Sequence, residues 1–148
     1  FVFPFCSALL ALQVSPSDIQ LALESVTDLG IAFQIRDDII DIYGEKGRNR
    51  RGSDIAEGKV SIFVTHINTS AADLDKMLMS EILKKDRSIT TDTDIELVIA
   101  VFEKNGSREF AEKEMTKYIE RAASRTFENP KISSAISALK EALTLRLP

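Results

Sequence analysis

The sequence is poor in the residues that build disulfides and zinc sites. Among its 148 residues there is one cysteine, Cys6, and one histidine, His66. A single cysteine excludes an intrachain disulfide framework, and one residue of each kind excludes a zinc site made of cysteine and histidine ligands. We expect Cys6 to be a core residue, His66 to serve surface or helix packing, and the protein to work in the reducing cytoplasm.

An excess of positive charge is missing as well. The formal net charge is −4 at pH 7, so general attraction to nucleic acid is not expected. Residues 1–12 are apolar, but the run is too short to span a bilayer and lacks the basic flank of a signal peptide. We expect a buried helix whose beginning is missing, no transmembrane segment, and a chain that is part of a longer protein.

Strand signals are nearly absent, whereas helical periodicity and helix start signals recur along the whole chain. The clearest start is Ser15-Pro16-Ser17-Asp18, and Gly44 is the matching stop. Short connections favour antiparallel neighbours. The sequence therefore predicts one all-α unit over residues 1–148, an antiparallel helix bundle. The expected helices span residues 16–43, 55–67, 71–85, 93–104, 107–126 and 130–145.

Three carboxylates fall in a strongly apolar part of the longest predicted helix: Asp37, Asp38 and Asp41. On a helical wheel they share one arc with Gln34, and this arc is small or apolar further upstream. An ordinary solvent face would stay polar along its length, so we expect a cavity with an acidic mouth. A plain solvated face is the alternative. The upstream residues of the arc are Gly30, Thr27 and Leu23.

The spacing of these acids suits a hard cation with oxygen ligands, Mg²⁺ above all, with Mn²⁺ as the alternative ion. Mg²⁺ usually completes its shell with water and substrate phosphate. Downstream, Arg50, Arg51 and Lys59 supply positive charge for phosphate oxygens, although a basic loop can also be a solvated turn that balances nearby acids. Acids, bases and an apolar wall together favour a site for a phosphorylated, lipid-like molecule.

Two separated blocks, residues 33–41 (FQIRDDIID) and 52–61 (GSDIAEGKVS), resemble the trans-type isoprenyl (polyprenyl) diphosphate synthases. The first is similar to the second aspartate-rich motif of that family, and the second to the glycine–aspartate turn and lysine that follow it. The resemblance implies the C-terminal half of an isoprenoid synthase fold. It also implies a homodimeric prenyltransferase that uses Mg²⁺ to condense an allylic prenyl diphosphate with isopentenyl diphosphate.

The resemblance also implies roles for the acids. Asp37 and Asp38 would bind the metal, and Asp41 would support or complete its shell. Asp54 would be either a metal contact or a helix N-cap. The first aspartate-rich motif of the family is not found in these residues, so the chain alone is expected to be inactive.

Other roles implied by the resemblance concern the substrate. Gln34 and Lys59 would be catalytic, with Lys59 also touching the allylic diphosphate. Arg50 or Arg51 would add a second diphosphate contact. The expected lining of the prenyl-chain cavity is Phe33 and Gly30.

Two further interpretations stay open. The chain could be a non-catalytic small subunit or regulatory partner of a heteromeric prenyl synthase. It could also be a relative of terpene cyclases, which likewise present acidic helices to Mg²⁺ and diphosphate. The second sequence block argues against the cyclase, because cyclases generally use a different second metal motif.

Overall fold

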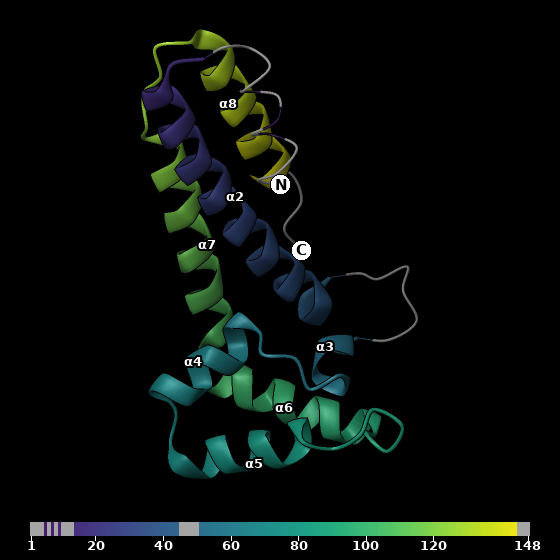
Figure 1. The fold of residues 1–148 in the computed structure, drawn as a ribbon. Coiled ribbons are helices and arrows are strands. Elements are labelled where there is room, and N and C mark those ends of the chain that lie inside the picture. The colour runs from purple at the N-terminus through teal and green to yellow at the C-terminus, as the bar shows by residue number, and fades with distance from the viewer. Residues whose placement is uncertain (1–4, 6, 8, 10–13, 45–50, 145–148) are drawn as a thin grey trace. The chain divides into compact units, whose positions relative to one another are not determined.

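A computed structural model describes residues 14–44 and 51–144, together with Phe5, Ser7 and Leu9. Every regular element among these residues is a helix (Figure 1), which confirms the all-α class. The predicted helix over residues 1–12 falls mostly outside the described residues, as does Cys6. The described helices are α2 (Pro16–Tyr43), α3 (Ser53–Ala56), α4 (Ile62–Ser70), α5 (Asp73–Leu83), α6 (Asp92–Lys104), α7 (Ser107–Ala123) and α8 (Pro130–Thr144).

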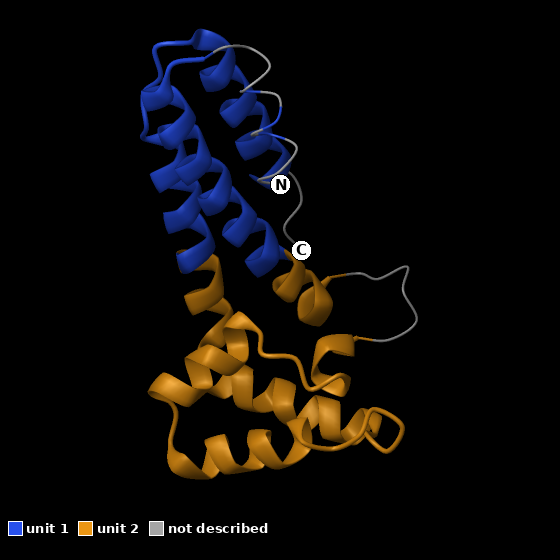
Figure 2. Ribbon diagram, in the orientation of Figure 1, with its two compact units in different colours: residues 1–36, 114–146 blue, residues 37–113, 147–148 orange. Residues whose placement is uncertain are grey.

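The chain forms two compact units, which Figure 2 shows in different colours. Unit 1 comprises Phe1–Arg36 and Glu114–Arg146, and unit 2 comprises Asp37–Lys113 and Leu147–Pro148. Helices α2 and α7 each contribute residues to both units. That the two units work as the one domain expected from the sequence stays a prediction.

In unit 1, a buried carboxylate joins α2 to α7 and the residues that follow it. Asp28 is 3% exposed and pairs with the guanidinium groups of Arg121 and Arg125, the latter at 2.8 Å. Burial alone would raise the pKa of Asp28, but the hydrogen bonds and charges of the two arginines outweigh it and hold this pKa below its usual value. Asp28 therefore ties α2 to Arg121 of α7 and to Arg125 just after it, and Arg125 also pairs with Glu24 of α2 at 3.3 Å.

A second buried aspartate links the start of α2 to the start of α8. The hydroxyl of Ser15 accepts the Asp18 N–H at 3.2 Å, as the helix start signal predicts. The Asp18 carboxylate is 2% exposed and accepts the N–H groups of Glu128 and Asn129 at 3.0 and 2.9 Å. Asp18 therefore satisfies backbone donors at the entry to α8.

In unit 2, the core is built around two fully buried aromatic rings. The ring centroids of Phe63 and Phe102 lie 5.3 Å apart, and the ring of Tyr43 lies 6.0 Å from that of Phe63. The last turn of α2 therefore rests on this aromatic core, and α5 and α6 run side by side next to it (Figure 1). Other fully buried side chains here are Ile39, Ile67, Met79, Val98 and Ile99.

The predicted helix over residues 55–67 is wrong, because the chain breaks it into α3 and α4. Gly58 follows α3 with φ +64°, a left-handed conformation that residues with a side chain rarely adopt. Ser61 then caps α4 by accepting the Val64 N–H at 3.4 Å. Helix α7 ends at Ala123 instead of residue 126, and α5, α6 and α8 begin and end close to the predicted residues. None of the described helices combines the length and apolar character needed to span a bilayer.

Candidate functional site

The three aspartates at the end of α2 lie in different surroundings. Asp37 is exposed, whereas Asp38 and Asp41 are only 5% and 6% exposed. All three belong to unit 2, but the single acidic arc expected from the sequence is divided, because Asp37 faces solvent and the side chains of the other two are buried. Within the described part of the chain, no three acidic, histidine or cysteine side chains are grouped to hold a metal ion.

The carboxylate of Asp41 serves the N-terminus of α3. It accepts the hydroxyl of Ser53 at 2.6 Å and the backbone N–H of Asp54 at 3.2 Å. The N-cap position of α3 belongs to Gly52, which has no side chain to offer, so Asp41 supplies the acceptor for the backbone N–H of Asp54 from outside the segment. The alternative that Asp54 is the N-cap is therefore wrong, because Asp54 lies inside the helix.

Asp38 likewise accepts a hydrogen bond at the N-terminus of α4. One of its carboxylate oxygens accepts the backbone N–H of Ile62, the first residue of α4, at 3.0 Å. A negative charge is favourable at this end of a helix, where unpaired N–H groups converge. Among the described residues, none forms an ion pair with Asp37. Asp37 is thus the carboxylate of the three that is exposed for a ligand.

Lys59 lies in the turn after α3 and is held by two acids. Its ammonium group is 2.7 Å from Asp54 and 2.8 Å from Glu57, and Glu57 also pairs with Arg87. Hydrogen bonds to Asp54 and Glu57 raise the pKa of Lys59 well above its usual value. The side chain is therefore an exposed cation at neutral pH, held between two carboxylates.

Arg51 precedes α3 in the chain and contacts the end of α2. Its Nε donates to the carbonyl of Ile42 at 2.6 Å, and its terminal nitrogens lie 3.5 Å from Glu96 and 3.9 Å from Glu103 of α6. Arg50, the other arginine predicted to contact diphosphate, lies outside the described residues.

The remaining predicted site residues lie on the part of α2 that belongs to unit 1. Gln34 is exposed, and Gly30 and Phe33 are half-buried. A Cβ atom at Gly30 would meet no atom within 4 Å, so the surface of the helix is open there. Their proposed roles towards a prenyl chain stay predictions.

Some features of the site region carry no signal in the sequence. The hydroxyl of Tyr43 is buried and, among the described residues, finds no hydrogen-bond partner. Burial raises the pKa of Tyr43, and the guanidinium of Arg108 lies 4.7 Å from the centre of its ring. Ser53 is likewise absent from the predicted site, although the Gly-Ser-Asp turn pointed to its neighbourhood. These contacts depend on residues distant in the chain, so no local sequence pattern predicts them.

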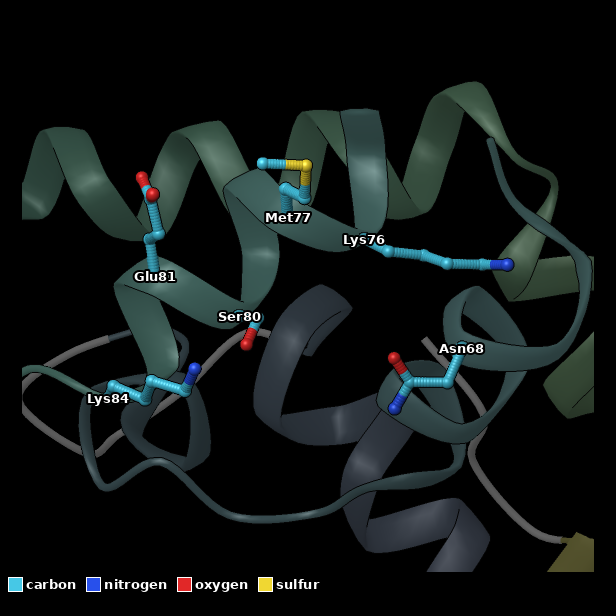
Figure 3. Close-up of a pocket in the computed structure, with 6 residues that line it drawn as sticks. All are labelled: Asn68, Lys76, Met77, Ser80, Glu81 and Lys84. Carbon is cyan, nitrogen blue, oxygen red and sulfur yellow. The ribbon is translucent and has the colours of Figure 1, made fainter. Parts of the chain in front are cut away.

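Two other features are separate from the acidic end of α2. His66 stacks on Phe110 with ring centroids 4.3 Å apart and lies 2.8 Å from the Ser107 hydroxyl, which confirms its packing role. A shallow hollow of about 390 Å³ lies beside α5, and Figure 3 shows the side chains that line it. No predicted site residue lines it, and its lining consists of Asn68, Lys76, Met77, Ser80, Glu81 and Lys84.

An all-helical fold with this acidic helix end and a following lysine turn is the arrangement expected of an isoprenoid synthase. The model of the polyprenyl synthetase family matches residues 1–101, which contain every predicted site residue. The chain belongs to the polyprenyl synthetase family.

Individual relatives agree with this assignment. The geranylgeranyl pyrophosphate synthase 2 of Gibberella fujikuroi is 30% identical over 155 aligned positions, which cover 97% of this chain and 39% of that protein. The crystal structure of geranylgeranyl pyrophosphate synthetase from Pyrococcus horikoshii matches with a TM-score of 0.73 and 27% identity, covering 87% of this chain and 39% of the other.

A third relative is known with ligands. The geranylgeranyl pyrophosphate synthase of Corynebacterium glutamicum, complexed with isoprenyl diphosphate and magnesium, matches with a TM-score of 0.69. Its 23% identity makes this a likeness of fold, over 90% of this chain and 39% of that one. In each of the three comparisons the chain spans 39% of the relative's length.

Proposed function

We propose that this chain supplies one half of the active site of a prenyltransferase. The enzyme would be an isoprenyl diphosphate synthase that condenses an allylic prenyl diphosphate with isopentenyl diphosphate to give linear isoprenoid diphosphates. The observation that carries the proposal is the different surroundings of the three aspartates at the end of α2. Asp38 and Asp41 are fixed by hydrogen bonds, and Asp37 beside them is exposed to a ligand.

The residues fit the proposed metal, Mg²⁺, with Mn²⁺ as the alternative ion. Mg²⁺ prefers oxygen donors, and it commonly takes only one or two protein carboxylates before water and phosphate complete its shell. Asp37, with Asp38 beside it, meets that need, and Asp41 supports both by fixing the turn. When bound, the metal would neutralise the negative charge that develops on the departing diphosphate.

The chain's own groups would do the rest. Lys59, protonated and held in place by Asp54 and Glu57, would bind diphosphate oxygens. Arg50 would contribute a second positive charge, whereas the contacts of Arg51 favour a different role. On the family resemblance, Gln34 would line the reaction centre. Phe33 and Gly30 would face the prenyl chain and keep water from it.

Two further proposals concern the whole protein. The full-length protein would act as a homodimer, and it would work in the cytoplasm. Both follow from the resemblance and from the composition, and both can be checked by sedimentation and cell fractionation of the full-length protein.

The decisive experiment is Asp37→Ala in the full-length protein, assayed with Mg²⁺, an allylic diphosphate and isopentenyl diphosphate. We expect turnover to fall about a hundredfold or more, with an unchanged circular dichroism spectrum. Asp73→Ala is the matched control, because the Asp73 side chain is 97% exposed and belongs to no predicted site. Full activity of the Asp37 variant would refute the proposed site. Brisk turnover by the 148-residue chain alone would refute the half-site.

A non-catalytic subunit is the second candidate. It is favoured by the structural use of Asp38 and Asp41 as caps, since a protein without activity would need those contacts too. Adding the chain to a complete synthase of the family separates the two. A changed product length, together with no effect of Asp37→Ala in any assay, would support the subunit and contradict the enzyme.

A further inference from the structure

Four consecutive residues, 51–54, form hydrogen bonds with the last turn of α2. The side chain of Arg51 donates to the Ile42 carbonyl, and the Gly52 N–H donates to the Asp41 carbonyl at 3.0 Å. Ser53 and Asp54 both donate to the Asp41 carboxylate. The end of the acidic helix is therefore held by backbone and side chain alike, from one short segment.

Arg51 is the member of this segment that reaches a third element. While its Nε bonds the Ile42 carbonyl, its terminal nitrogens face Glu96 and Glu103 on α6. A cation at the C-terminal end of a helix is favourable, because unpaired carbonyls converge there. The planar guanidinium spreads its donors over three nitrogens, each of which faces a different acceptor, whereas a lysine offers a single nitrogen.

We propose that Arg51 is a positioning residue, which holds the last turn of α2 against α6 and so sets the direction of Asp37 and Asp38. On this assignment Arg51 does not touch the diphosphate, because its donors are directed to a carbonyl and two carboxylates. The inference rests on the proposed function for its effect on metal binding. Residues that orient metal ligands commonly change metal affinity by about 10- to 100-fold when they are lost.

The first test needs no activity. Amide hydrogen exchange of the 148-residue chain, followed by NMR, measures how far the hydrogen bonds to Asp41 protect the N–H groups of Gly52 and Asp54. Arg51→Met should speed their exchange about tenfold, and Glu96→Gln with Glu103→Gln should act in the same direction. Lys76→Met is the matched control, since Lys76 lies in another surface ion pair of the same unit. Unchanged exchange in Arg51→Met would overturn the proposal.

The second test uses the full-length protein. Arg51→Met should raise the Mg²⁺ concentration for half-maximal rate about tenfold, while KM for the allylic diphosphate at saturating Mg²⁺ stays within about twofold. Arg51→Lys should recover part of the loss. A raised KM with an unchanged Mg²⁺ requirement would make Arg51 a direct ligand and overturn the proposal. An equal rate loss at every Mg²⁺ concentration would also overturn it. If the unaltered protein is inactive, the proposed function fails, and the exchange result stands on its own.

Discussion

The carboxylate of Asp41 and the hydroxyl of Ser53 lie 2.6 Å apart, and this contact ties the end of α2 to the start of α3. The same carboxylate takes the Asp54 N–H, and the neighbouring Asp38 takes the N–H of Ile62. Asp38 and Asp41 of the aspartate-rich motif therefore also accept hydrogen-bond donors at the starts of two other helices. Their loss and the loss of Asp37 should have different physical consequences.

The first prediction compares Asp41→Asn with Asp37→Asn in the 148-residue chain. An amide at position 41 loses the charge and turns a donor towards Ser53 or Asp54, so we expect a loss of about 1–3 kcal/mol in the free energy of unfolding. Exposed Asp37 should change it by no more than about 0.5 kcal/mol. Urea unfolding at neutral pH measures both. Equal losses in the two variants would contradict the capping role of Asp41.

The second prediction concerns the break between α3 and α4. Gly58 has φ +64°, and a Cβ there would lie 2.6 Å from the carbonyl oxygen of Leu83. Gly58→Ala should therefore lower the free energy of unfolding by more than about 1 kcal/mol. Gly30→Ala, in the middle of α2 with open space around it, should instead raise it by about 0.5–1 kcal/mol. Thermal and urea unfolding of both variants test the pair, and a tolerated Gly58→Ala would show that the turn has another conformation.

The third prediction is a pH dependence centred on the start of α6. Lys85, 2.6 Å away, and the N–H and hydroxyl of Thr91 lower the pKa of Asp94 from 3.8 to about 2. Because the folded pKa is below the unfolded one, this group stabilises the fold fully above pH 3.8, and its contribution is lost as the pH falls towards about 2. Asp94→Asn should lower the melting temperature at neutral pH, and the gap to the unaltered chain should close at acid pH.

The control for this experiment is Asp73→Asn, which removes an acid whose side chain is 97% exposed. Its melting temperature should follow that of the unaltered chain throughout the acid range. A gap for Asp94→Asn that stays constant with pH would mean that the carboxylate charge is not what holds this helix start.

Helix class and most helix ends could be predicted because they depend on local patterns. The proline after Ser15, the glycine after Tyr43 and the Asn105-Gly106 stop act within a few residues, and all three hold in the structure. The sequence does not predict the break at Gly58, since a glycine inside an apolar periodic stretch does not by itself indicate a left-handed turn.

The site was predictable in its residue types but not in their surroundings. The family resemblance picks out Asp37, Asp38 and Asp41 together and assigns them related roles. Their different burial depends on the partners Ser53 and Ile62, which are distant in the sequence and reach the acids only through the tertiary fold. For the same reason, the direction of Arg51 towards α6 could not be inferred from the basic loop.

The hydrogen bonds of Asp38 and Asp41 to the starts of α3 and α4 affect how such a motif would change in evolution. A descendant that gave up the reaction would still gain stability from both residues, because Asp41 accepts donors at the start of α3 and Asp38 adds to the Ser61 cap of α4. The exposed Asp37 carries no such folding constraint, so it would be the first of the three to drift. On the proposed function, the residue at this one position would therefore distinguish active from inactive homologues better than the motif as a whole.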